Sequence, residues 1–332
     1  MVYAYHKSLF SHIKEGVITM STSMTSVEES TEEQWKQIKR VIEDAVPKAV
    51  VIVRKKFPVD KNGAQTILMS GDQIQDAVVD AIIAKFKELT ITDQYADEVA
   101  ESQYTYPPEY SLKSLPQQIE VLLKHFPDLK VEKTLEFIDK VLPTLKLPDG
   151  AEGCFAIPSW EKIAPTYHAA VQRILSVLAS ARKFHNYREN QLDEKHLRQH
   201  ARTIAYLAKL AEGQNGDILI IPAQFGMKHR GESTRRARET FRFDEFGFGW
   251  FAVGCMYLTH PDRAVRFEEL DTDCPGDEFS DEAVGDFSSA PRFVFHSGQL
   301  KTGSLDVSIA YDGYGSVSGF LPQYPSLEAS NI

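Results

Sequence analysis

The sequence predicts an α+β protein, in which a helical N-terminal domain with a β-hairpin is followed by a mixed domain that ends in a small antiparallel sheet. Three observations support this prediction. Apolar residues recur at helical spacing through much of the chain, and residues 217–241 have the pattern of a buried strand, a basic loop and a capped helix. From Pro291 onward, short alternating apolar runs are separated by Ser-Gly and Asp-Gly turns, which is typical of antiparallel strands.

The length of 332 residues predicts more than one domain, and 42% apolar residues are enough to form a sizeable core. The strongest boundary signal is the turn-forming sequence Leu147-Pro148-Asp149-Gly150. We therefore expect a flexible N-terminal tail at 1–30, an α-rich domain with a hairpin at 31–150, and a mixed α+β domain with a basic loop, an acidic loop and C-terminal strands at 151–332.

The first structured element is expected to be a helix that starts at a capping box formed by Thr31 and Gln34 and stops at Pro47. The β-branched run Ala49–Val53 then predicts a strand. An Asp-Lys-Asn-Gly turn and the apolar run Thr66–Met69 predict the returning strand of a hairpin.

Further helices are expected from their apolar spacing at 72–89, 115–126, 131–146, 167–178 and 197–211. A strand is expected at 218–222. The apolar segment 246–258 is interpreted as a buried helix that stops at Pro261, with a strand as the alternative. In the C-terminal part, strands are expected around Phe293–Phe295, Val307–Ile309 and Val317.

The net charge of −10 argues against general DNA binding, because a polyanion would be repelled except at a local basic patch. Three cysteines, Cys154, Cys255 and Cys274, lack metal-type spacing and fit reduced thiols in the cytoplasm. No segment reaches the roughly 18 consecutive apolar residues that span a bilayer, so no membrane partner is expected.

The most informative segment, Gly226 to Ser233, has the glycine spacing and the final hydroxyl of a phosphate-binding loop. Glu232, however, stands where that motif requires lysine. From Lys228 to Arg242 the chain carries six basic and two acidic residues, a local charge of +4. Ser233 is a good N-cap for the helix that follows, and free amides at a helix N-terminus attract anions.

This segment is therefore predicted to bind an anionic small molecule, either a nucleotide or another phosphate-bearing ligand, or a short RNA. The predicted ligand-binding residues are Lys228, His229, Arg230, Ser233, Arg235 and Arg238. The alternative is that the arginines form internal salt bridges with the acidic loop that follows.

That acidic loop, residues 268–286, holds nine acidic residues and no Lys or Arg. It matches a calcium-binding loop only in part, because Pro275 stands where an oxygen ligand is expected. An irregular Mg²⁺ or Ca²⁺ site would use Asp271, Asp273, Asp277 and Glu282. A solvated loop is the alternative.

A third cluster, Asp193, His196 and His200, shares one face of the helix expected there. Zinc is disfavoured because Leu197 occupies the position at which zinc proteases carry glutamate. A hydrogen-bonded histidine is the preferred interpretation.

Three functions follow from these patterns. The first is binding of an anionic ligand through residues 217–242. The second is non-catalytic self-assembly into a homo-oligomer through the acidic and basic segments. The third is a metal-assisted hydrolase that pairs acids of 271–286 with His229 or His260.

Overall fold

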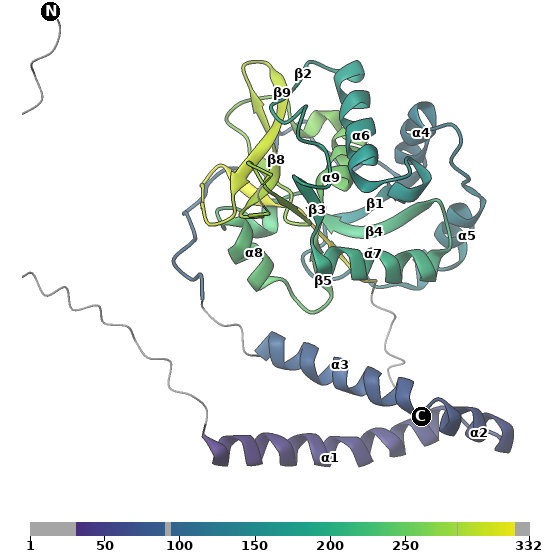
Figure 1. Cartoon of the computed structure of the whole chain (residues 1–332). Coiled ribbons are helices and arrows are strands. Elements are labelled where there is room, and N and C mark those ends of the chain that lie inside the picture. Colours follow the sequence, from purple (N-terminus) through teal and green to yellow (C-terminus); the bar gives the residue numbers. More distant parts are fainter. Residues whose placement is uncertain (1–30, 90–93, 284, 323–332) are drawn as a thin grey trace, which may run out of the picture. The chain divides into compact units, whose positions relative to one another are not determined.

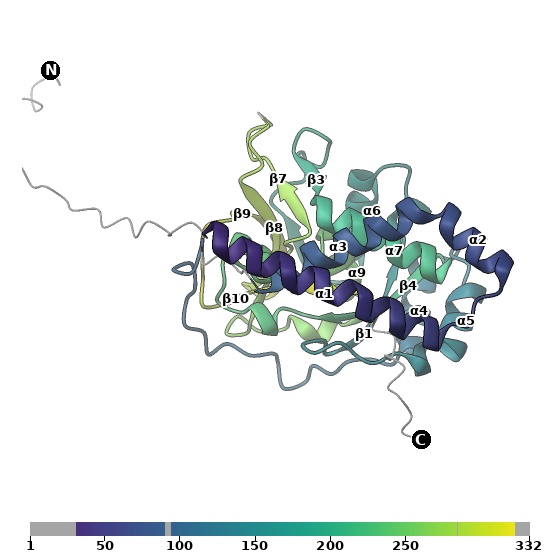
Figure 2. The ribbon, with the colours of Figure 1, turned by 90° about the horizontal axis from the view of Figure 1, so that it is seen from below.

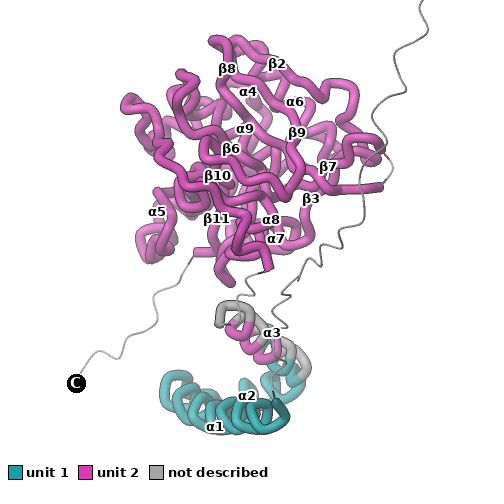
Figure 3. Tube along the Cα trace, turned by 90° about the vertical axis from the view of Figure 1, so that its left-hand side faces the viewer, with its two compact units in different colours: residues 1–77 teal, residues 78–332 magenta. Residues whose placement is uncertain are grey.

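A computed structural model describes residues 31–89, 94–283 and 285–322 (Figure 1). The chain forms two compact units, residues 1–77 and 78–332 (Figure 3), and the fold is α+β with N-terminal helices and an antiparallel sheet. The division between the units falls within helix α3 (Gly71–Leu89), whereas the turn at 147–150 lies inside the second unit. The expected tail at 1–30 lies outside the described residues.

The first unit contains helices α1 (Glu32–Lys56) and α2 (Lys61–Met69) and the beginning of α3. The capping box that was predicted for α1 is confirmed. The Gln34 amide donates to the Thr31 hydroxyl at 3.2 Å, and the Thr31 amide donates to the Gln34 side chain at 2.7 Å. These two bonds satisfy amides that a helix start would otherwise leave unpaired.

The predicted hairpin is wrong, because residues 49–53 belong to α1 and residues 66–69 belong to α2. Pro47 does not end α1 but lies inside it. Apolar side chains at helical spacing continue past the proline, and this pattern outweighs the local β-propensity of the valine-rich run. The expected turn starts a helix instead, since Asp60 caps α2 by accepting the Gly63 amide at 2.7 Å.

The second unit contains an antiparallel four-stranded sheet, counted over the described residues. Its central strand β4 is buried at every residue and pairs with β1, where Ile221 lies opposite Phe155. The strands in spatial order are β1 (Gly153–Pro158), β4 (Ile218–Gln224), β11 (Ser318–Phe320) and β5 (Glu245–Gly247).

A second sheet has seven strands among the residues that the structure describes. Most of its pairs are antiparallel, and only β10–β6 and β2–β9 run parallel. The strands are β2 (Phe184–Asn186), β3 (Leu197–Gln199), β6 (Asp271–Asp273), β7 (Asp277–Phe279), β8 (Ser289–His296), β9 (Gln299–Asp306) and β10 (Tyr314–Ser316). The predicted strand at 293–295 lies in β8, whereas 307–309 follow the end of β9.

Val317 alone separates β10 of the larger sheet from β11 of the smaller one. Its amide donates to the carbonyl of Asp273 at 3.1 Å, and its carbonyl accepts from the amide of Phe248 at 3.0 Å. The backbone of Val317 therefore connects the two sheets by hydrogen bonds.

The helices of the second unit surround these sheets. They are α4 (Leu115–His125), α5 (Glu132–Lys140), α6 (Tyr167–Ala181), α7 (Ala201–Gln214), α8 (Thr234–Thr240) and α9 (Trp250–Thr259), with short 3-10 turns η1 (Leu142–Thr144), η2 (Trp160–Lys162), η3 (Met227–His229) and η4 (Pro261–Arg263). Figures 1 and 2 show α6 beside α9, and the two helices pack together.

Helix α9 forms the centre of the core and confirms the buried helix that the sequence favoured for 246–258 from Trp250 onward, whereas Phe246 and Gly247 belong to strand β5, as the alternative had it. Every residue from Trp250 to Thr259 is buried. Trp250 donates to the Thr302 hydroxyl in β9 at 2.6 Å, and the helix also packs on β1 of the other sheet. No helix within the described ranges has both the length and the apolar content that crossing a membrane requires.

Candidate functional site

The strand, loop and capped helix predicted for 217–241 are present as β4, η3 and α8. Ser233 is the N-cap of α8, and its hydroxyl accepts the Arg236 amide at 3.1 Å. The local fold is therefore as the sequence indicates.

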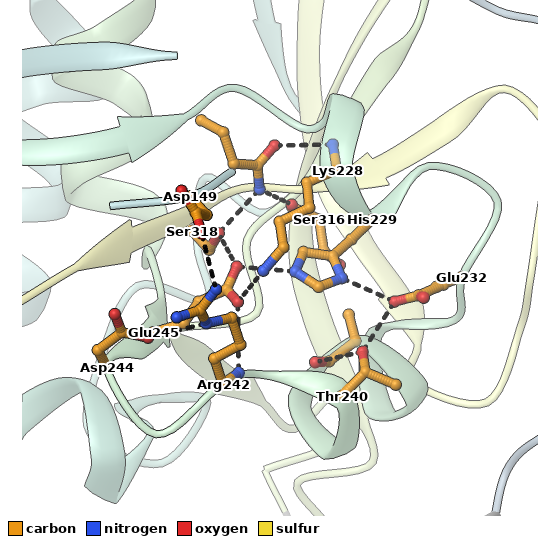
Figure 4. Close-up of polar contacts among 12 residues, drawn as sticks. Asp149, Lys228, His229, Glu232, Thr240, Arg242, Asp244, Glu245, Ser316 and Ser318 are labelled. Atoms are coloured by element: carbon orange, nitrogen blue, oxygen red, sulfur yellow. Dashed lines mark hydrogen bonds and ion pairs between the residues drawn. The ribbon is translucent and has the colours of Figure 1, made fainter. Parts of the chain in front are cut away.

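Lys228 and His229 belong to a polar cluster (Figure 4), in which His229 and Glu245 are buried and the side chain of Lys228 is 25% exposed. The His229 ring lies between two carboxylates, with Nδ1 2.8 Å from Glu232 and Nε2 2.8 Å from Glu245. Lys228 forms an ion pair with the same Glu245. Both cations thus have carboxylate partners inside the fold.

The electrostatics of this cluster favour charged groups in spite of burial. Burial opposes the charged form of His229, but hydrogen bonds to Glu232 and Glu245 raise its pKa above the ordinary value. Burial likewise opposes the charge on Glu245, yet His229 and Lys228 lower the pKa of that carboxyl to about 2. An imidazolium held at both nitrogens has no free position with which to act as a general base.

Further hydrogen bonds connect the cluster to three neighbouring strands of the smaller sheet. The Ser318 hydroxyl in β11 donates to Glu245 in β5 at 2.6 Å, and the Gln224 amide in β4 donates to Ser318 at 2.9 Å. The Gln224 oxygen in turn accepts the backbone amide of Lys228 at 3.2 Å. The cluster therefore fixes the loop to three strands, which is a structural role.

Arg230, Ser233 and Arg235 contact the segment at 98–104. Arg230 donates to the carbonyl of Tyr104 at 3.0 Å. Glu98 accepts the Ser233 hydroxyl at 2.6 Å and binds the Arg235 guanidinium, with Nε 2.9 Å from both carboxylate oxygens. A carboxylate of the chain itself therefore occupies the start of α8, where the sequence predicted an external anion.

Arg238, the last predicted ligand-binding residue, forms hydrogen bonds with the backbone of the larger sheet in and beside β7. Its guanidinium donates to the carbonyls of Pro275 at 2.9 Å and Asp277 at 2.7 Å, and burial lowers its pKa. All six predicted ligand-binding residues thus have intramolecular partners. Sequence reasoning missed Glu98, because it is distant in the chain and lies in a segment without helical or strand periodicity.

The four predicted metal ligands are dispersed. Asp271 accepts the Phe295 amide at 2.9 Å, and Asp277 accepts the Tyr167 hydroxyl at 2.8 Å and the Trp250 amide at 2.7 Å, at the start of α9. Asp273 is buried, whereas Glu282 is exposed. In the described part of the chain, no group of three or more His, Cys, Asp or Glu could hold a metal ion.

The two histidines considered for a hydrolase do not join these acids. His229 belongs to the polar cluster above. The ring of His260 accepts the Lys113 amide at 3.1 Å and contacts the Thr259 hydroxyl at 2.9 Å, and burial lowers its pKa to about 4. His260 is therefore neutral near pH 7, and its ring contributes to the packing of the buried core.

The helix expected to carry Asp193, His196 and His200 on one face is not formed there, because Leu197 to Gln199 are strand β3. His196 contacts Asp193 at 2.8 Å, and His200 is the N-cap of α7. Pairing of β3 with β7 explains the difference, since tertiary contacts override a short helical pattern.

A cavity of about 460 Å³ lies over β8 and β9, away from the residues that the sequence singled out. It presents two guanidinium groups, hydroxyl groups and a small apolar surface. Its lining consists of Tyr187, Arg188, Arg292, Val294, Thr302, Gly303 and Ser304. We call it the Arg188–Arg292 cavity.

Arg292 lies in β8 of the larger sheet. In the register of the strands it lies directly opposite Gly303 of β9 and Asp273 of β6. Because Gly303 has no side chain, the space beside the guanidinium stays open. Within the described ranges, the side chain of Arg292 has one hydrogen-bond partner, the Tyr314 hydroxyl at 2.8 Å, and no carboxylate within 4 Å.

Arg188 is the second arginine that lines the cavity. It forms an ion pair with Asp281 and donates to the Gln191 side chain at 3.0 Å. Its buried Nε has no hydrogen-bond partner among the described residues. Sequence reasoning missed both arginines, since neither lies in a motif and only the fold brings them together.

Buried polar groups continue from Arg292 across the sheet. Asp273 and Ser316 face each other in neighbouring strands, and the Ser316 hydroxyl is buried without a partner in the described part of the chain. Burial raises the pKa of Asp273 to about 7, although the charges of Arg292 and Arg238 oppose the rise. The carboxyl next to the cavity thus titrates near neutral pH.

Comparison with known proteins gives no family. No protein-family model matches the chain, and neither curated proteins nor solved structures provide a match. What the chain can bind must therefore be inferred from the chemistry of its own residues.

Proposed function

We propose that this protein binds a small phosphate- or carboxylate-bearing ligand in the Arg188–Arg292 cavity. The observation that supports the proposal is a guanidinium, that of Arg292, which lines a cavity and has no carboxylate partner within 4 Å among the described residues. An unpaired charge in a partly buried position is costly unless a ligand or solvent satisfies it.

The cavity has the donors that an oxyanion requires. Guanidinium groups bind carboxylates and phosphates through paired N–H donors, and two of them line this cavity. Lys301 adds a third cation beside it, since its ammonium group lies 3.3 Å from the Tyr187 hydroxyl. Val294 and the Tyr187 ring supply apolar surface for the remainder of a ligand.

Cavity size favours a small molecule over a polymer. About 460 Å³ lies within the range of roughly 300–1,000 Å³ that is usual for small-molecule sites. A free nucleotide therefore fits the proposal better than a short RNA. The basic loop at 226–242 is a weaker candidate for the site, because its cations already bind Glu98, Glu232 and Glu245.

Two further parts of the proposal rest on the state of the cysteines and on where the acidic residues and the histidines lie. We place the protein in the cytoplasm, because all three cysteines are free thiols. We rank ligand binding above a metal-assisted hydrolase, because the acids of 271–286 and the two histidines lie in separate clusters of the described fold.

Calorimetric titration with inorganic phosphate, adenosine monophosphate and acetate, each against chloride at equal ionic strength, tests the proposal. We expect saturable binding of at least one of the three. Arg292→Gln should weaken it about tenfold or more, because a hydrogen bond to a charged group contributes about 1.5–3 kcal/mol. Arg266→Gln removes the same charge from the exposed ion pairs with Glu109 and Glu269 and should leave binding unchanged.

A second variant tests the cavity independently of charge. A Cβ at Gly303 would lie 3.7 Å from Tyr187, which is ordinary van der Waals contact, so Gly303→Val should fold and fill the space. We expect it to abolish binding. If none of the three anions binds at millimolar concentration, or if both variants bind as the unaltered chain does, the proposal is wrong.

A further inference from the structure

Helix α1 carries an apolar stripe along one side. Its residues recur alternately at four and three positions, the spacing of a coiled-coil seam. We call this stripe the α1 seam; it consists of Ile38, Ile42, Ala45, Ala49 and Ile52. None of the residues of α1 is buried in the described structure.

Valines on both sides widen the seam. Val41, Val46 and Val53 flank it and are between 48% and 70% exposed. Pro47 lies on the opposite side of the helix, two residues from Ala45 and two from Ala49, so it does not interrupt the stripe. Ile38 and Ile42 are partly exposed and Ile52 is exposed, and a contiguous accessible apolar surface of this kind is typical of an interaction site.

We propose that the α1 seam is a homodimer interface, in which α1 of a second copy packs antiparallel on it. The order of side chains in the seam supports this orientation. With the two helices centred between Glu43 and Asp44, Ile38 lies opposite Ala49 of the second copy and Ile42 lies opposite Ala45. Ile38 and Ile42 then each meet an alanine, which keeps the helices close over the central part of the seam, and Ile52 lies opposite Trp35.

A parallel pair would place isoleucine on isoleucine and alanine on alanine. The helices would be held apart at Ile38 and Ile42 and would leave a gap at Ala45 and Ala49. Gaps and overpacking both cost stability in an apolar interface.

Charge supports the same orientation. The first turn of α1 carries Glu32 and Glu33, and the last turn carries Arg54, Lys55 and Lys56. An antiparallel pair brings each acidic end beside a basic end, and it also opposes the two helix dipoles favourably. A parallel pair would place the basic ends together.

Sedimentation equilibrium of the full chain at micromolar concentrations tests the interface. We expect a dimer for the unaltered chain and a monomer for Ile42→Glu, because a charge would be buried in the seam. Val50→Glu is the matched control, since Val50 is 61% exposed and lies outside the seam. It should remain dimeric. Circular dichroism of both variants checks that the helices persist.

Cysteine cross-linking tests the orientation and does not depend on any disruptive variant. Gln34 and Lys55 lie at opposite ends of α1. A mixture of Gln34→Cys and Lys55→Cys chains should form a mixed disulfide on oxidation, and neither chain alone should form one efficiently. A monomeric unaltered chain, a dimeric Ile42→Glu, or disulfides within each variant alone would overturn the proposal.

Discussion

The carboxylate of Glu98 accepts a hydrogen bond of 2.6 Å from the hydroxyl of Ser233, the residue that caps helix α8. The same carboxylate binds Arg235, and these contacts lower the pKa of Glu98. The chain thus supplies its own anion to the basic segment. Removing a charged side chain from this segment should therefore lower the free energy of unfolding, by an amount that depends on how deeply that side chain is buried.

Arg238→Ala should lower the free energy of unfolding by about 1–3 kcal/mol, because it leaves the carbonyls of Pro275 and Asp277 without their donors. Arg235→Ala should cost less, about 1 kcal/mol or below, since its side chain is 38% exposed. Urea unfolding measures both. Arg198→Ala, which breaks an exposed pair with Glu278, is the control and should cost least. Equal effects of all three would contradict a structural role for Arg238.

The buried His229 should make stability depend on pH. Its pKa in the folded chain is raised above the ordinary 6.5, so the protonated ring stabilises the fold fully below that pH. This contribution is lost as the pH rises through the folded pKa. The difference in unfolding free energy between the unaltered chain and His229→Gln should therefore shrink from pH 6 to pH 9. A difference that stays constant over this range would show that folding does not raise the pKa of the ring.

The buried carboxyl of Asp273 should also make the free energy of unfolding depend on pH. Its pKa is raised from 3.8 to about 7, so folding keeps the carboxyl protonated and becomes less favourable as the pH rises between these values. Asp273→Asn removes this penalty. Relative to the unaltered chain, the variant should gain stability between pH 4 and pH 7, by up to about 1.4 kcal/mol per pH unit. Asp277 titrates in both chains, whereas Asp271 loses the charge of Asp273 that helps to raise its pKa, which adds to the gain in the variant.

A metal titration tests the hydrolase alternative directly. If residues 271–282 bind Mg²⁺ or Ca²⁺, a millimolar concentration of the ion should raise the melting temperature, and chelator should reverse the rise. Because Asp271 and Asp277 already accept hydrogen bonds from the protein, we expect identical melting curves with and without metal. A rise that Asp273→Asn abolishes would restore the metal site.

Local signals in the sequence were enough to predict several elements. The capping box at Thr31, the buried helix α9 and the strand, loop and helix around Ser233 each depend on residues close together in the chain. The false hairpin also came from a local signal, the valine-rich run at 49–53. There the helical period of α1 outweighed the β-propensity of four residues.

The partners of the basic residues and the cavity could not be predicted in the same way. Glu98 meets Arg235, and Arg188 shares a cavity with Arg292, only after the sheets have formed. The sequence did contain the alternative that the arginines pair internally. It did not contain the identity of the partners, which for Arg235 is a glutamate upstream, Glu98, and for Arg238 are two backbone carbonyls of the acidic loop downstream.

The single residue between β10 and β11 has a consequence for synthesis on the ribosome. β11 lies between β4 and β5, and Val317 bonds to residues next to strands of both sheets. Translation delivers these residues long after β4, the strand that is buried throughout. Until they emerge, a nascent chain exposes the open edge of an apolar strand, so we expect it to bind chaperones and to aggregate if translation stalls before residue 318.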